Sequence, residues 1–262
     1  MAILGFAGEW AAIWAIAFAA NLAAYFGLGL ALDRINRAHP ERRIQTGRDG
    51  MRRARAEIRE SVRSIAATAL CLSLAIALSR GGWTLWTPPE GAGWPWTLGA
   101  ALGLILGYDA WYYWMHRLMH TERLWAWHAW HHRSVAPTVW SSDSQSLPET
   151  LLVQGFLVLA TLLFPVTPAA LVLHRLYDHV NGQIGHAGFE YFADRSTRFP
   201  SPMVCTAYHD LHHERFRWNF GNYFSFWDRL CGTLHPDYDG MVARLEGAAK
   251  SGEAVGEARR AR

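Results

Sequence analysis

Long apolar stretches organise this sequence and restrict the folds open to it. They are Trp10–Leu32, Ile65–Leu78, Thr97–Met115 and Glu149–Leu173. About 20 apolar residues are enough for a helix to cross the hydrocarbon core of a bilayer. The first stretch is too long for the apolar part of a signal peptide, and no basic segment precedes it. The sequence therefore predicts an all-α, polytopic membrane helical bundle.

Positive charge is concentrated between the first two apolar stretches. Lys250 is the only lysine, whereas ten arginines lie in the segment from Asp33 to Arg63. A segment of this kind can bind nucleic acid, but its place between two apolar stretches favours a cytoplasmic membrane loop. We therefore expect a membrane and no nucleic acid as partner. The arginine bias is typical of a bacterial source, which predicts the inner membrane as the location.

With this loop in the cytoplasm, Thr97–Met115 returns the chain to the cytoplasmic side, and His116 follows there. The fourth stretch contains Phe164–Pro168, whose two prolines disfavour continuation of a helix. We expect two arms, Glu149–Leu163 and Ala169–Val180, folded back as a hairpin that keeps all later histidines on one side. The first arm is about 22 Å long and the hydrocarbon core is about 30 Å thick, so a full crossing stays open.

Three histidine motifs follow the third apolar stretch, and one further histidine stands alone. The first motif is HxxxH and the other two are HxxHH; their members are His116 and His120, then His128, His131 and His132, then His209, His212 and His213, with His186 alone. Residues three and four apart share one face of a helix, so each motif should present its imidazoles in one direction. One HxxHH is expected by chance only about 0.03 times at this histidine content. We therefore interpret the motifs as metal ligands rather than as interfacial or core histidines.

The number of imidazoles predicts more than one metal ion. Neutral imidazole binds iron, zinc, copper and nickel, and eight or nine imidazoles exceed what one ion can take. We expect a cytoplasmic, histidine-rich helical cap that holds a di-metal site at the membrane, where an apolar substrate can reach it without leaving the lipid.

The residues around the motifs form longer patterns. These are Asp109–Thr121, Leu124–His132, Tyr208–His213, Asn219–Gly221 and Trp227–Thr233. Together they resemble the fatty acid hydroxylase/sterol desaturase superfamily over roughly residues 116–233. The resemblance implies two iron ions that activate dioxygen as co-substrate, and a reaction that hydroxylates or desaturates a C–H bond of a lipid such as a fatty acyl chain or a sterol-like molecule.

The resemblance also implies which residues are ligands. They are the eight motif histidines, His116, His120, His128, His131, His132, His209, His212 and His213, with His186 as the family's additional histidine. Other polar residues could orient a ligand through its free ring N–H, as metal-bound histidines usually require. The candidates for this role are Asp109, Asp178, His179, Asn181, Asn219 and Asp228.

The expected reaction needs two electrons per turnover from outside the chain. The three cysteines have no CxxC spacing, and the sequence contains no haem, flavin or iron–sulfur motif. We therefore expect an external electron donor, such as a reductase, a ferredoxin or a cytochrome b5-like carrier. Zinc can occupy such a site in purified protein, because affinity orders favour zinc over iron.

Two other functions stay open at this point. A zinc-dependent membrane hydrolase would suit the histidines, although catalytic zinc uses about three protein ligands and no HExxH motif is present. A non-enzymatic metal transporter or sensor would need polar residues along a membrane path, whereas the histidines lie at helix ends.

The chain is expected to divide into three parts. Residues 1–95 form N-terminal transmembrane helices with the arginine-rich loop. Residues 96–240 form a catalytic unit with a transmembrane helix, the hairpin and the histidine motifs. Residues 241–262 form a polar C-terminal tail.

Overall fold

The computed structural model describes residues 2–86 and 91–260, and its named elements are all helical. The long helices are α1 (Ala2–Ala38), α2 (Ala54–Arg80), α3 (Trp94–Met119), α5 (Leu147–Leu163) and α6 (Pro168–Gly185). The shorter ones are α4 (Trp125–His128), α7 (Thr206–Arg215), α8 (Phe226–Cys231), α9 (Tyr238–Ser251) and α10 (Val255–Arg260), with 3-10 turns at Pro40–Arg42, Met51–Arg53, His131–Arg133 and Arg195–Thr197. The predicted all-α fold is confirmed.

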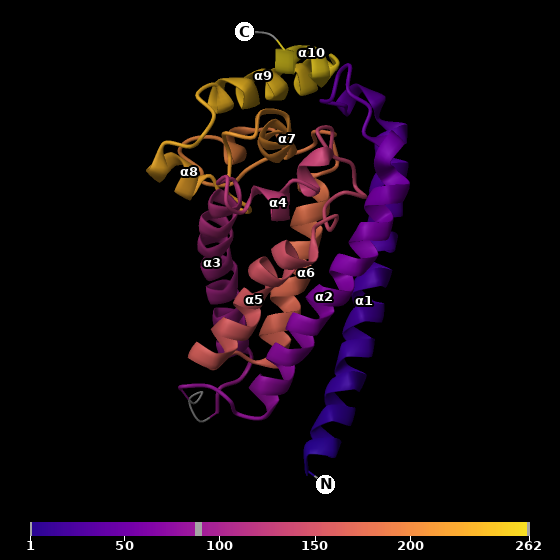
Figure 1. The fold of residues 1–262 in the computed structure, drawn as a ribbon. Helices are drawn as coiled ribbons and strands as arrows, with labels where there is room; N and C mark the ends of the chain where they lie inside the picture. Colours follow the sequence, from indigo (N-terminus) through magenta and orange to yellow (C-terminus); the bar gives the residue numbers. More distant parts are fainter. Residues whose placement is uncertain (1, 87–90, 261–262) are drawn as a thin grey trace.

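The five long helices form the body of the molecule, and the short helices gather at one end of it (Figure 1). The α1–α2 connection, which carries the arginines, lies at this same end, beside α7 and α10. The end of α2 and the start of α3 lie at the opposite end, toward which the first part of α1 also extends. The arginine-rich loop and the histidine motifs therefore share one end of the bundle, as the sequence predicts.

Two helical segments in the described ranges are long and apolar enough to span a membrane: Glu9–Ala38 and Met51–Arg80. The first has only 17% of its apolar window buried, compared with 61% for the second. Helix α1 therefore lies at the rim and exposes an apolar surface of the kind that lipid covers, whereas α2 lies inside the bundle. The third predicted span forms α3, which is not one of these two segments.

The predicted hairpin is present as α5 and α6, and local chemistry explains its ends. The Ser146 side chain accepts a hydrogen bond from the Glu149 N–H and caps the start of α5. Helix α5 ends at Leu163 because Phe164 is extended before Pro165. The Thr167 side chain accepts from the Ala170 N–H and caps α6, whose first residue is a proline.

Small and aliphatic side chains from all five long helices fill the core of the bundle. Buried members are Ala17 of α1, Leu72 of α2, Leu104 of α3, Leu157 of α5 and Leu171 of α6. Packing of this kind holds helices together in lipid, where burial from water contributes little between helices. The core positions the histidine-bearing ends of α3 and α6 and the start of α5 next to one another.

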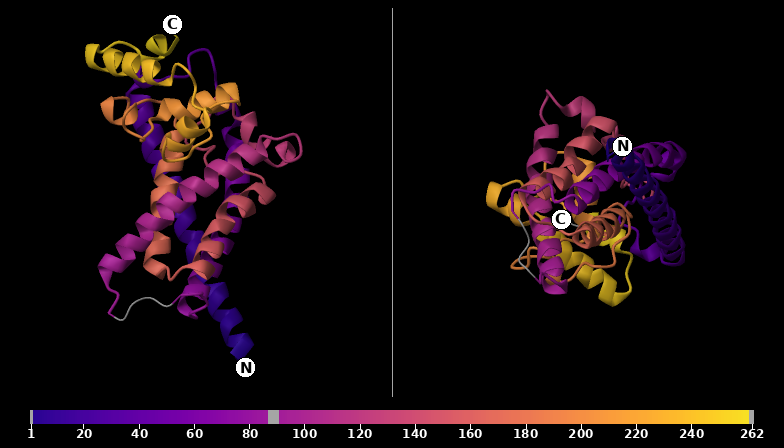
Figure 2. Two further views of the ribbon diagram at one scale, coloured as in Figure 1. Left: turned by 90° about the vertical axis from the view of Figure 1, so that its left-hand side faces the viewer. Right: turned by 90° about the horizontal axis from the view of Figure 1, so that it is seen from below.

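The C-terminal segment is helical, which the sequence analysis did not anticipate. Helices α9 and α10 lie across the end of the molecule, over α7 (Figure 1 and Figure 2). Val242 and Leu245 of α9 and Val255 of α10 are buried in one cluster with Tyr208 and Leu211 of α7. The apolar positions recur at helical spacing among many charged ones, which is why composition alone made the segment look like a polar tail.

Ion pairs also hold α7 in place. Asp210 is fully buried on α7 and lies 2.7 Å from the guanidinium groups of both Arg48 and Arg259. Arg48 comes from the α1–α2 loop and Arg259 from α10, so one carboxylate joins three distant parts of the chain. Breaking a buried pair on one side is costly because an uncompensated charge stays behind.

The role of the C-terminal helices is testable by truncating one core side chain. Leu245→Ala should lower the free energy of unfolding by about 2–5 kcal/mol, because Leu245 is fully buried against α7. The thermal midpoint of the purified protein in detergent measures this. The control is Leu230→Ala at an exposed position of α8, which should change stability by about 0.5 kcal/mol or less. Equal midpoints for the two variants would contradict the packing of α9 on α7.

Candidate metal centre

Nine histidines converge at the cap end of the bundle in two groups. Group A contains His116, His120, His128, His132 and His212, and group B contains His131, His186, His209 and His213. Within each group one ring nitrogen of every residue lies within 4.8 Å of the others. These are the nine histidines that the sequence analysis selects, now divided between two sites.

The division between the groups follows the spacing inside each motif. Histidines four apart stay together: His116 and His120 in group A, and His209 and His213 in group B. In an HxxHH motif, the first and second histidines are three places apart and belong to different groups. His209 is thus in group B and His212 in group A. On a helix, positions i+3 and i+4 differ by about 100° in direction. One turn of helix can therefore serve two sites at once, and the prediction that each motif points one way needs this correction.

The second motif shows the same division without a continuous helix. Helix α4 ends at His128, and His131 begins a separate 3-10 turn. His128 and His132 belong to group A, whereas His131 belongs to group B. A break between the two elements lets both groups receive ligands from one short segment.

The distances between ring nitrogens fit shared ions. In group A the Nε2 atoms of His116 and His128 are 3.0 Å apart, and those of His132 and His212 are 3.1 Å apart. In group B the Nε2 atoms of His186 and His209 are 3.0 Å apart. Two nitrogens that each lie about 2.1 Å from one ion are separated by about 3.0–3.4 Å at tetrahedral or octahedral angles.

The opposite ring nitrogens show that these contacts are not ordinary hydrogen bonds. The Nδ1–H of His131 donates to the Ser144 carbonyl and that of His186 to the Gly182 carbonyl. Both Nε2 atoms then carry lone pairs, yet they face each other at 3.3 Å. Two acceptors are held this close when a cation lies between them, so the donor set fits a metal ion.

Backbone carbonyls fix the rings in group A in the same way. His116 Nδ1 donates to the Phe220 carbonyl at 2.8 Å, and His212 Nδ1 donates to the Trp218 carbonyl at 2.7 Å. These bonds select the tautomer that leaves Nε2 free to bind a metal.

Burial keeps the imidazoles neutral. It lowers the pKa of His131 to about 3 and the pKa values of His120 and His186 to about 4. Burial, and then the neighbouring imidazoles, hold the pKa of His209 and His213 well below the usual value. Neutral imidazole is the form that binds metal, so each ring is ready for an ion without losing a proton.

Glu149 is a part of the site that the sequence analysis missed. Its Oε1 lies 2.7 Å from Nδ1 of His128, both side chains are almost fully buried, and Oε2 has no partner among the described residues. A carboxylate on the far nitrogen orients a metal-bound imidazole and raises its basicity. The available signal was a single acidic residue opening an otherwise apolar helix.

Four of the six residues predicted to orient ligands, Asp109, Asn181, Asn219 and Asp228, do so only indirectly. In the described parts of the chain, Asp109 accepts from the backbone N–H groups of Tyr223 and Phe224, and Asp228 accepts from that of Phe220. Asn219 spans the Tyr208 carbonyl and the His235 N–H, and Asn181 donates to the Asn222 carbonyl. Their carboxylates and amides form hydrogen bonds with backbone groups that would otherwise be unpaired in this loop. They thereby fix the loop whose carbonyls accept hydrogen bonds from the ligand histidines.

Asp178 and His179 make no hydrogen bond to a histidine of either group in the described parts of the chain. Asp178 pairs with Arg175 at 2.8 Å and accepts from the Tyr223 hydroxyl. His179 receives a hydrogen bond from Arg175 through Nδ1. Both belong to a separate polar cluster on α6.

The division into two groups predicts selective loss of metal. His212→Ala should remove the ion of group A and His131→Ala the ion of group B, so that each variant keeps about half of the wild-type metal. The double variant should lose nearly all of it. Elemental analysis of the purified protein measures the ratio. A wild-type ratio in both single variants would refute the grouping.

Glu149→Gln tests the carboxylate behind His128. Metal affinity should fall by about 10–100-fold in group A, because the amide is a weaker acceptor for the His128 N–H. Competition with a chelator reads this out as early release of one ion, with group B unaffected. The matched control is Glu122→Gln at an exposed position. Simultaneous early release of both ions would contradict a role confined to group A.

Comparisons with known proteins identify distant relatives of this chain. Rat methylsterol monooxygenase 1 is 29% identical over 164 residues, which cover 61% of this chain and 54% of the relative. A zebrafish cholesterol 25-hydroxylase-like protein is 28% identical over 144 residues, covering 53% of this chain and 56% of that protein. The chain thus spans about half the length of these curated relatives.

No solved structure matches the chain. The sequence model described as "Fatty acid hydroxylase" matches residues 101–233, which hold all nine histidines of the two groups. With the two apolar spans, this match indicates an integral membrane protein. The chain belongs to the fatty acid hydroxylase family.

Proposed function

We propose that this protein is a membrane di-iron oxygenase that hydroxylates or desaturates a C–H bond of a lipid. The observation that carries the proposal is the pair of buried, neutral histidine groups at the end of an apolar bundle. Family membership supports iron as the metal and a lipid as the substrate. In the reaction, dioxygen takes two electrons and two protons from outside; one oxygen atom enters the product as hydroxyl or, in desaturation, both leave as water.

Group A and group B would each hold one iron ion through the nine histidines. When bound there, the ions would supply the chemistry that activates dioxygen with external electrons. The chain itself fixes the imidazoles through carbonyl hydrogen bonds and excludes water from the ligand set by burial. We further propose that residues 96–240 form the catalytic unit on the transmembrane helices of residues 1–95, and that α9 and α10 of the C-terminal segment close the cap.

Electrons need a route from a donor to the buried histidines, and Trp125 offers one. Its ring lies 5.4 Å from the rings of both His120 and His132, and its side chain is partly exposed. An external reductase, ferredoxin or cytochrome b5-like carrier could deliver electrons at this face. We propose that this face lies on the cytoplasmic side of a bacterial inner membrane. The arginine-rich loop at the same end supports the cytoplasmic side.

The ligand count argues against the other functions. Catalytic zinc uses about three protein ligands, whereas the groups contain five and four histidines. A transporter would need metal-binding groups along the membrane path. The candidate ligands instead gather at one end of the bundle, where α3 and α6 terminate.

Isotope labelling tests the proposal. Iron-loaded protein supplied with lipid extract, an artificial electron donor and ¹⁸O₂ should yield a lipid that gains one labelled oxygen atom or loses two hydrogens. The His131→Ala and His212→Ala double variant is the control and should give no product. Product formed without dioxygen would overturn the oxygenase assignment.

A further inference from the structure

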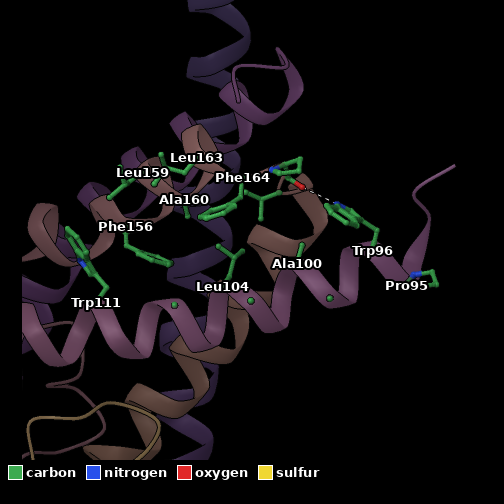
Figure 3. Close-up of a pocket in the computed structure, with 15 residues that line it drawn as sticks. Pro95, Trp96, Ala100, Leu104, Trp111, Phe156, Leu159, Ala160, Leu163 and Phe164 are labelled. Carbon is green, nitrogen blue, oxygen red and sulfur yellow. Dashed lines mark hydrogen bonds between the residues drawn. The ribbon is translucent and has the colours of Figure 1, made fainter. Parts of the chain in front are cut away.

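In the described parts of the chain, two grooves open on the apolar surface of the bundle, and the second has a polar end. The groove between α3 and α5 has a volume of about 530 Å³ and a lining of aliphatic, glycine, proline and aromatic residues (Figure 3). Its two indole N–H groups, on Trp96 and Trp111, already donate to the carbonyls of Pro165 and Leu152. Nothing in its described lining can fix the orientation of a ligand.

The second groove lies between α1, α2 and α6 and has a volume of about 410 Å³. Ala20, Ile76 and Val172 are among its apolar lining residues, and one end carries Asn21, Arg175 and His179. The last two residues also line a polar chamber of about 40 Å³ on their other side. They therefore form the boundary between a lipid-facing groove and an internal space.

The chamber reaches the metal centre. His186 of group B lines it, together with Gln154 of α5 and Asp143 of the α4–α5 connection. A space of this size holds a water molecule or a single polar group. A lipid in the groove would therefore end at Arg175 and His179. Only the small chamber lies between these residues and His186.

Two buried polar atoms of residues that line this chamber lack hydrogen-bond partners among the described residues. The His179 Nδ1 accepts from Arg175, so Nε2 carries the proton, yet Nε2 makes no hydrogen bond of ordinary length to any described residue. The Gln154 amide donates to the Tyr108 hydroxyl and to Asp178, while its Oε1 accepts nothing. His179 is only 4% exposed and Gln154 only 6%. Buried groups of this kind are costly unless something pairs with them, so one free donor and one free acceptor await a ligand.

The charges at the chamber select the kind of ligand. Arg175 contributes one positive charge and is 2.8 Å from Asp178 and 3.1 Å from Asp143. Two carboxylates against one guanidinium leave these side chains with a net negative charge, which opposes a third carboxylate from a ligand. A hydroxyl group is uncharged, accepts from one neighbour and donates to another, and so matches both free atoms.

We propose that the groove between α1, α2 and α6 and the chamber behind it bind a lipid with an uncharged hydroxyl end. The hydroxyl oxygen accepts from His179 Nε2–H and its proton is donated to Gln154 Oε1, while the hydrocarbon lies in the groove. The two spaces thus form the lateral entrance from the bilayer. The identification of this lipid as the substrate rests on the proposed function, whereas the binding itself does not.

Equilibrium binding of two probes of equal chain length tests this inference. Hexadecanol and palmitate are titrated against the metal-loaded protein in phosphatidylcholine nanodiscs, without dioxygen. Hexadecanol should bind more tightly than palmitate. His179→Phe and Gln154→Leu should each weaken hexadecanol binding by about tenfold, because each removes one hydrogen bond.

Matched variants serve as controls. His174→Phe changes another buried histidine of α6 that lines neither space and should leave binding unchanged. Ala20→Trp fills the proposed entrance and should block hexadecanol, whereas Ala100→Trp fills the α3–α5 groove and should not. Metal content of each variant confirms that it has folded.

Three results would overturn the inference: palmitate binding as tightly as hexadecanol, unchanged hexadecanol binding in both His179→Phe and Gln154→Leu, or a block by Ala100→Trp in place of Ala20→Trp. The binding experiment needs no turnover, so it tests this inference alone. The proposed function is tested separately by the isotope experiment.

Discussion

The rest of the cap depends on the hydrogen bonds from histidine Nδ1 atoms to fixed acceptors. Each bond turns an Nε2 lone pair toward its neighbours, and several lone pairs then face one another inside a buried space. Without a cation this arrangement is repulsive and the rings are poorly solvated. Metal binding and folding of the cap are therefore coupled, as in other sites whose ligands come together only in the folded state.

The acceptors are themselves held by the polar residues around them. Asp228 binds the backbone N–H groups of Phe220 and Gly221, and Asp109 binds those of Tyr223 and Phe224. A loop without regular structure is thereby given a defined shape, so that its carbonyls can position rings. The bundle contributes the other half of the support, because the ends of α3 and α6 and the start of α5 are placed by an apolar core.

Much of this arrangement could be predicted from residue spacing. The proline break between α5 and α6 and the convergence of nine histidines both follow from rules that act over a few residues. Three features could not be predicted in that way. The first is the division of each HxxHH motif, which depends on where the two sites lie in space. The second is the set of ring acceptors, which are mostly backbone carbonyls and carry no sequence signal. The third is Glu149, which is recognisable only once α5 is packed against His128.

Helix α7 supplies His209 and His213 to one site and His212 to the other. Inserting or deleting one residue within this turn would rotate the histidines beyond it by about 100° and send them to the wrong ion. Length variation among homologues should therefore be absent between residues 209 and 213. It should accumulate instead in connections such as the one between α8 and α9, where no candidate ligand depends on helical phase.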